Sequence, residues 1–113
     1  MREFVYRNRI RVSTNDLASA RTGKKTCTIR LGRASVAGTD LTLTDGREQL
    51  RVRVLRTDTS KTFGQLGAAE ANGEGFSSVA ELEADLRTYY RRIQADDPVT
   101  VIWFERLPGT PGA

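Results

Sequence analysis

The 113-residue sequence contains no histidine, and this absence removes more functions than any other feature of the composition. Without histidine the chain cannot build a Ser-His-Asp or Cys-His catalytic site, and it lacks the usual zinc ligand sets. Any proton transfer near neutral pH must then use a lysine, a carboxylate or water. The carboxylates show no D-x-D or similar spacing suited to magnesium. We therefore expect neither a metal nor another cofactor.

Cysteine and long apolar runs are also scarce. A single cysteine, Cys27, excludes an internal disulfide, which fits a reducing cytoplasm. No run approaches the ~20 apolar residues that span a bilayer, and the first residues lack the hydrophobic region of a signal peptide. With 38% apolar and 28% charged residues, the chain is predicted to be one cytoplasmic domain over residues 1–113, a monomer or weak dimer. Its glycine-proline tail, residues 108–113, is predicted to fray.

Positive charge is concentrated in the first half of the chain. Residues 1–61 hold 14 Lys and Arg against 6 Asp and Glu, whereas residues 62–113 hold 4 against 8. A basic half is a plausible footprint for nucleic acid or nucleotide phosphate, and it also fits an arginine-rich soluble surface. The arginines on open strand faces, which could bind phosphate or protect a strand edge from aggregation, are Arg7, Arg9, Arg11, Arg51 and Arg53.

Hydrophobic periodicity predicts the order β-α-β-β-β-α-α-β. The predicted strands are residues 4–12, 26–30, 41–44, 50–54 and 99–104. The last of these is apolar on both faces, as expected of an interior strand. Asp45-Gly46 is typical of a type I′ hairpin turn between the third and fourth strands. Residues 31–40 have the composition of a loop.

Capping residues and helical spacing predict the helices. A cluster of N-cap residues at positions 13–16 begins a short helix, and Gly23 would end it in the left-handed conformation. Residues 63–66 suit one helical turn. The capping box at 78–81 opens an amphipathic helix that we expect to end near Asp96-Asp97-Pro98.

The most informative stretch is Gly23-Lys24-Lys25-Thr26-Cys27-Thr28-Ile29-Arg30. In a strand, Thr28 and Arg30 share one face while Cys27 and Ile29 point into a core. Lys25 is out of phase and can join the polar face only from the turn before the strand. An amine, a hydroxyl and a guanidinium would then meet on one patch. The alternative is an exposed edge strand with solvated polar residues.

Four residues of this stretch, Gly23, Lys25, Thr28 and Arg30, match G-x-K-x-x-[TE]-x-R. This pattern resembles the signature of the ASCH family (the ASC-1 homology domain, a relative of the PUA RNA-binding fold). The similarity covers roughly residues 4–107 and looks closest to small single-domain bacterial members, which include acetylcytidine amidohydrolases. It implies an α+β fold, a small PUA-like mixed β-barrel with flanking helices. One departure, Thr39 inside the family's tight Gly-Asp turn, leaves the path of residues 31–40 open.

The resemblance to the amidohydrolase-type members implies three catalytic residues. Lys25 matches the lysine that acts as base, Thr28 the proposed nucleophile, and Glu74 the proton donor. Arg30 would be structural or bind phosphate, and with Lys24 it would place positive charge at the mouth of the site. The implied reaction removes an acyl group from the exocyclic amine of cytidine, in a nucleoside or in RNA. Without the family, Glu74 between Gly73 and Gly75 is equally a solvated residue of a connector.

Two other functions remain open at this point. The basic half and the PUA kinship fit a non-catalytic RNA-binding module. A ribonuclease, an activity also attributed to ASCH proteins, would use Lys25 and Arg30 to stabilise a pentavalent phosphate. The position of Glu74 relative to Lys25 separates these readings, because a binding module needs the charge of the cleft and not this carboxylate.

Overall fold

The computed structural model describes residues 4–107. Its elements are β1 (Phe4–Tyr6), β2 (Arg9–Arg11), α1 (Thr14–Arg21), β3 (Cys27–Leu31), β4 (Ala34–Val36), β5 (Asp40–Thr44), β6 (Gln49–Asp58), the 3-10 turn η1 (Phe63–Gln65), α2 (Ala68–Gly73), α3 (Val79–Tyr89) and β7 (Val99–Arg106). The predicted tail, residues 108–113, lies outside the described residues. No helix among residues 4–107 has the length and apolar character needed to cross a membrane.

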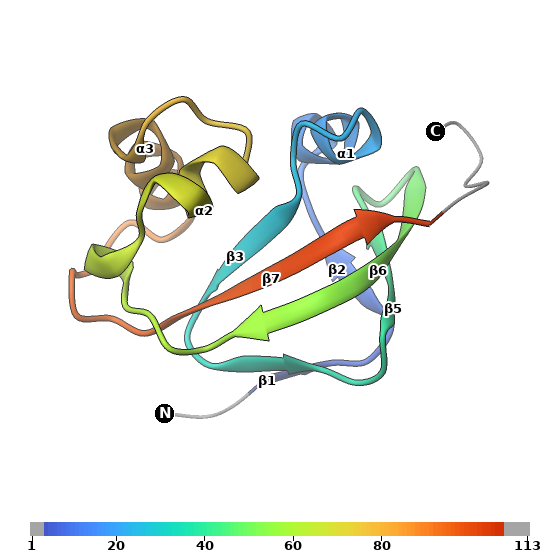
Figure 1. Ribbon diagram of the computed structural model, residues 1–113, viewed down its shortest axis with the longest axis horizontal. Helices are drawn as coiled ribbons and strands as arrows, with labels where there is room; N and C mark the ends of the chain where they lie inside the picture. Colours follow the sequence, from blue (N-terminus) through green and yellow to red (C-terminus); the bar gives the residue numbers. More distant parts are fainter. Residues whose placement is uncertain (1–3, 108–113) are drawn as a thin grey trace.

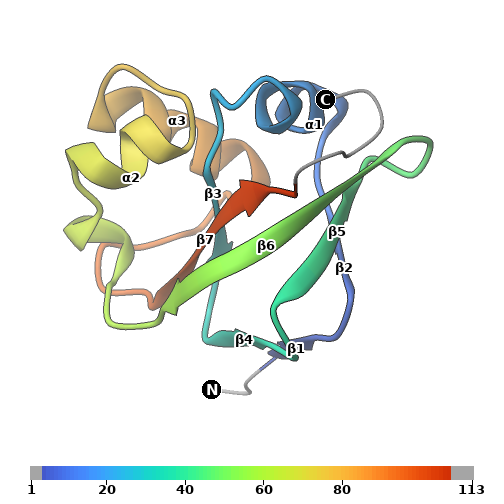
Figure 2. The same ribbon diagram turned by 45° about the vertical axis from the view of Figure 1, so that its right-hand side comes forward.

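Five strands form one mixed sheet in the order β2-β5-β6-β7-β3. The β2–β5 pair is parallel and the other three pairs are antiparallel. The sheet curls into a half-barrel, with the three helices gathered at one end and the short parallel pair β1–β4 at the other (Figures 1 and 2). The predicted α+β class is therefore confirmed.

The two edge strands of the sheet, β2 and β3, face each other across the opening of the half-barrel, which we call the seam. No ladder joins them among the described strands. One side chain crosses instead: Nη2 of Arg30 on β3 donates to the carbonyl of Arg11 on β2 at 2.7 Å. The seam thus stays open enough for side chains to line it, and the candidate functional site lies there.

Two apolar clusters hold the fold together. The hairpin core consists of Ile10, Val12, Leu17, Ala20, Leu41, Leu43, Leu50, Val52, Ile102 and Phe104. The helix core consists of Cys27, Ile29, Phe63, Leu66, Ala71, Leu82, Leu86, Ile93, Val99 and Val101. Strand β7 contributes to both, which explains why its sequence is apolar on both alternations. Its predicted interior position is confirmed, because it lies between β6 and β3.

The predicted helix starts are confirmed by their caps. Ser13 accepts a hydrogen bond from the backbone N–H of Asp16 at 3.0 Å, and Ser78 accepts one from Glu81 at 3.2 Å. Gly23 takes a φ of 85°, so it follows α1 in the left-handed conformation that side chains disfavour.

Several boundaries differ from the prediction. The first predicted strand is two strands, because β1 pairs with β4 whereas β2 pairs with β5. The segment 31–40 contains strand β4 and is not a simple loop. Helix α3 ends at Tyr89, and a turn then brings Ile93 into the helix core. Helix α2 was not predicted, because its segment is polar and rich in glycine.

The predicted type I′ turn is wrong. That turn requires positive φ at both central residues, and among the described residues only glycines have positive φ, here Gly46 at 98°. Strand β5 ends at Thr44 and β6 begins at Gln49, so the loop has four residues. The Asp45 carboxylate accepts hydrogen bonds from the N–H groups of Arg47 and Glu48 at 2.9 and 2.8 Å, which closes the longer loop.

Candidate functional site

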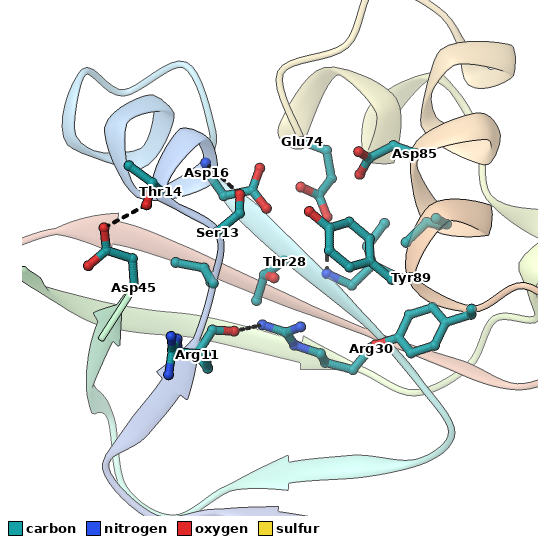
Figure 3. A pocket seen from close by; sticks show the side chains of 14 residues that line it. Arg11, Ser13, Thr14, Asp16, Thr28, Arg30, Asp45, Glu74, Asp85 and Tyr89 are labelled. Atoms are coloured by element: carbon teal, nitrogen blue, oxygen red, sulfur yellow. Dashed lines mark hydrogen bonds between the residues drawn. The ribbon is translucent and has the colours of Figure 1, made fainter. Parts of the chain in front are cut away.

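A cavity of about 430 Å³ opens at the seam, between β2 and α1 on one side and β3, α2 and α3 on the other (Figure 3). Thr28 and Arg30 reach it from β3, and Glu74 reaches it from the end of α2. The cavity therefore brings together residues that are 46 positions apart in the chain. It is also bounded by both tyrosines at the end of α3, Tyr89 and Tyr90.

Lys25 and Glu74 form a buried ion pair beneath this cavity. Lys25 is 1% exposed and Glu74 is 8% exposed, and the Lys25 ammonium hydrogen-bonds Oε1 of Glu74. Oε2 of Glu74 accepts from the backbone N–H of Ile29 at 3.1 Å. One carboxylate thus joins the lysine to the residue that follows Thr28. Lys25 is not an exposed turn residue, and its side chain lies behind Glu74 and not on the cavity wall.

Two glycines explain how Glu74 reaches this position. A Cβ on Gly73 would lie 2.7 Å from a ring carbon of Trp103 and 2.8 Å from the sulfur of Cys27, so only glycine lets the end of α2 approach the sheet. The carbonyl of Gly73 then accepts from the N–H of Thr26 at 2.6 Å. Gly75, with φ of 87°, turns the chain away immediately afterwards. Glu74 is thus the C-cap residue of a helix and not part of a flexible connector.

Burial controls the protonation of Glu74. Desolvation raises the pKa of its carboxyl, the charge and hydrogen bond of Lys25 oppose that rise, and the neighbouring Asp16 and Asp85 add to it. A carboxyl that is buried in this way can hold a proton more readily than an exposed glutamate. The site therefore contains a carboxyl suited to donate a proton, hydrogen-bonded to the side-chain nitrogen of Lys25.

Thr28 presents the hydroxyl of the site. It is only 3% exposed, yet it lines the cavity from β3 and points into it (Figure 3). No residue among 4–107 forms a hydrogen bond with this hydroxyl. Its oxygen is open to the cavity, so it is free to form a hydrogen bond with a ligand that enters there.

The other predicted site residues are divided between the cavity and the outer surface. Arg30 lines the cavity, where its Nε is buried without a hydrogen-bond partner from the described residues. Lys24 is exposed and borders a separate hollow with Asn72 and Gly75.

The remaining predicted arginines, Arg7, Arg9 and Arg51, are exposed and lie away from the cavity wall. Arg51 pairs instead with the Asp40 carboxylate, at 3.3 Å. The structure therefore does not gather these three arginines at the predicted catalytic residues.

Sequence reasoning missed three carboxylates, Asp16, Asp45 and Asp85, that also line the cavity. Asp16 belongs to the N-cap cluster that begins a helix, and the sequence analysis did not single out Asp85. Both line the same cavity because α1 and the end of α3 lie on opposite sides of it (Figure 3). Glu74 is paired with Lys25, and the three aspartates share the wall with two guanidinium groups, those of Arg11 and Arg30. The wall therefore carries both signs of charge, and the positive charge expected at the mouth stays a prediction.

Burial also acts on Asp85. Its desolvation raises the pKa of this carboxyl, the charge of Asp16 raises it further, and Lys25 opposes both. No group of three or more Cys, Asp or Glu side chains within residues 4–107 is arranged to hold a metal ion. The polar groups that line the cavity are hydroxyls, carboxylates and guanidinium groups.

Comparison with known proteins identifies the fold. No protein-family model and no curated protein matches the sequence. A solved structure described as hypothetical protein PH0355 matches with a TM-score of 0.64 and 16% identity, over 94% of this chain and all of its own. The ASCH domain from Lactobacillus crispatus JV V101 matches with a TM-score of 0.66 and 14% identity, over 89% and 79% of the two chains. The protein EF3133 from Enterococcus faecalis V583 matches with a TM-score of 0.58 and 18% identity, over 80% and 68%.

At these identities the similarity concerns the fold. The chain has the fold of an ASCH domain, and the PUA-like architecture predicted from the Gly23–Arg30 signature is confirmed.

Proposed function

We propose that this chain is an amidohydrolase that removes an acyl group from the exocyclic amine of cytidine, with Lys25, Thr28 and Glu74 as its catalytic residues. One observation carries the proposal. An unpartnered threonine hydroxyl faces a cavity next to a buried lysine–glutamate pair, and Glu74 binds both the lysine and the backbone of the residue after that threonine. The ASCH-domain fold and the signature residues support the same reaction class.

The ion pair can supply both the base and the acid. Transfer of one proton from the Lys25 ammonium to Glu74 leaves a neutral amine and a carboxyl group. The total charge of the pair stays zero, and burial raises the pKa of Glu74, which favours the proton on the carboxyl. A threonine needs such a base, because its hydroxyl is a weak nucleophile while it keeps its proton.

The proposed reaction then proceeds in two stages. The oxygen of Thr28 attacks the acyl carbon as its proton passes to the Lys25 amine. The tetrahedral intermediate collapses when the C–N bond breaks, and the Glu74 carboxyl protonates the departing amine of cytidine. Water next attacks the ester on Thr28 and gives up a proton to the Glu74 carboxylate. Acid is released, the Thr28 hydroxyl regains a proton from Lys25, and the original groups are restored.

A binding module without catalysis is the second candidate, and one observation favours it. Arg7, Arg9 and Arg53 are exposed and lie away from the cavity, so they remain available to a nucleic acid. A ribonuclease has less support. Its phosphate would need the Lys25 ammonium, which is bonded to Glu74 behind the cavity wall.

Thr28→Val is the sharpest test of the proposed reaction. It replaces the hydroxyl by a methyl group of similar size and leaves the ion pair intact. We expect turnover of N4-acetylcytidine to fall at least about 100-fold, while Thr28→Ser keeps part of the activity. Product release is measured by chromatography. Thr42→Val on β5, outside the cavity, makes the same chemical change and should be as active as wild type.

Two outcomes would contradict the proposal. One is a Thr28→Val variant as fast as wild type. The other is wild-type protein that is inert on acylated cytidines yet binds labelled RNA with an affinity that falls steeply with salt, which would favour the binding module. Lys25→Arg would remove the proposed base and keep the positive charge, but it is a poorer test than Thr28→Val. At 1% exposure Lys25 has no free space around it, so the larger guanidinium would also disturb packing.

A further inference from the structure

We propose that Asp16 and Asp85 make the cavity selective for ligands without a phosphate group, so that the substrate is a free nucleoside or base and not a nucleotide or an RNA strand. The inference rests on the proposed function for the reaction. The binding preference that it predicts can be measured without any turnover.

The two carboxylates approach the cavity from different helices. Asp16 lies in the first turn of α1 and Asp85 lies on α3, and both project towards the space in front of Glu74 and Thr28 (Figure 3). Both are partly buried. Among residues 4–107 neither carboxylate has an ion-pair partner or a hydrogen-bond donor. They are free acceptors on the wall of the cavity.

The nearby positive charges compensate for them only in part. Lys25 is already paired with Glu74, so the guanidinium groups of Arg11 and Arg30 are the two positive charges left on the wall. Asp45 adds a further negative charge, because hydrogen bonds from Glu48, Arg47 and Thr14 lower its pKa to about 2. The positive N-terminus of α1 is offset by Asp16 itself, and the end of α3 that lines the cavity is its negative end.

A phosphate group would therefore enter an unfavourable field. A phosphomonoester carries a charge of about −1.5 to −2 at neutral pH, and opposed like charges in a partly buried site weaken binding strongly. Ribose hydroxyls and base amines have the opposite effect, since they donate hydrogen bonds to free carboxylates.

The Thr28 hydroxyl gives independent support for a ligand in this cavity. It is nine-tenths buried, lacks a partner among the described residues and points into the same space as the two carboxylates. The cavity thus offers one hydroxyl and two acceptors to a small polar molecule.

Titration calorimetry with cytidine and cytidine 5′-monophosphate tests the inference. At moderate salt we expect wild type to bind cytidine at least about tenfold more tightly than the monophosphate. The double variant Asp16→Asn, Asp85→Asn should tighten monophosphate binding at least fivefold and reduce the preference. Asp96→Asn removes one exposed carboxylate outside the cavity and should leave the preference unchanged.

The salt dependence gives a second readout that needs no variant. Repulsion is screened by salt, so monophosphate binding to wild type should tighten as salt is raised, whereas an attractive phosphate site would weaken. Equal or tighter binding of the monophosphate, an unchanged preference in the double variant, or binding of neither ligand would overturn the inference. A cytidine preference without hydrolysis of N4-acetylcytidine would overturn only the proposed function.

Discussion

The hairpin core and the helix core differ in what lies beside their apolar side chains. Around the hairpin core the buried polar residue is Thr44, whose hydroxyl bonds to the carbonyl of Glu48 in the adjacent loop. On the other side of β7, the fold buries a lysine, two glutamates and two threonines: Lys25, Thr28, Glu70, Glu74 and Thr100. The hairpin core is thus stabilised mainly by apolar packing, whereas the region around the helix core also carries the free-energy cost of desolvated polar groups.

This difference shows that the candidate site lies in the part of the fold where buried polar groups lower the stability. Burying two charges is costly, and an ion pair recovers that cost only when its remaining hydrogen bonds are also satisfied. Glu74 meets this condition through Lys25 and the N–H of Ile29. The helix core is therefore the half in which single substitutions should have the largest and most pH-dependent effects.

The largest effect is expected from Lys25→Met. It leaves Glu74 buried without its cation and should lower the free energy of unfolding by about 3–5 kcal/mol at neutral pH. Because burial already raises the pKa of Glu74, the folded variant keeps a proton that the unfolded chain releases. Its stability should thus be highest in acid and fall as the pH rises. Urea unfolding at pH 5 and pH 8 measures this.

Leu43→Ala in the hairpin core is the control for that experiment. Leu43 is fully buried among apolar side chains, so its truncation should cost about 2–5 kcal/mol. No titrating group changes its partner, and the loss should be the same at both pH values. Equal pH dependence in the two variants would remove the contrast between the cores.

A smaller effect is expected from Gly73→Ala. The new Cβ would overlap the ring of Trp103 and the sulfur of Cys27, so α2 must move and take Glu74 with it. We expect a loss of about 1–3 kcal/mol in the free energy of unfolding, with a fall in any activity of the site.

Gly67→Ala, at the other end of α2, is the matched control for Gly73→Ala. Its Cβ would meet only an ordinary contact, 3.7 Å from Glu70. A Gly73→Ala variant as stable as Gly67→Ala would show that the close approach of α2 to the sheet is dispensable.

The smallest effect on stability is expected from Thr28→Val. The hydroxyl has no partner among the described residues, and valine suits a strand, so unfolding should change by less than about 1 kcal/mol. Calorimetric melting measures this change. A large destabilisation would mean that Thr28 is a structural residue, and loss of activity in the same variant could not then be assigned to the missing hydroxyl.

Local patterns predicted most of the hairpin half. Alternation placed Leu41, Leu43, Leu50 and Val52 on the buried face, and the capping serine placed α1 correctly. The signature selected Lys25 and Thr28, and the resemblance to amidohydrolase-type members added Glu74. The structure brings these residues to one site, and their catalytic roles remain a prediction.

Long-range packing determined what the patterns missed. Glu74 became a helix end because Gly73 fits against Trp103, 30 positions later in the chain. The carboxylates of Asp16 and Asp85 line one cavity only because α1 and α3 lie on opposite sides of the seam. Nothing local distinguishes either aspartate from an ordinary solvated helix residue, so the acidic character of the cavity could not be predicted from the sequence.

The position of β3 has a consequence for the synthesis of the protein. Its sheet partner is β7, and the pairing begins with Cys27 opposite Trp103. While the ribosome is still making the intervening residues, the hairpin β5–β6 can already form, but β3 has no strand to pair with. Lys25 and Thr28 therefore cannot reach their final positions until β7 has emerged, and the end of the domain that carries the candidate site is assembled after the hairpin.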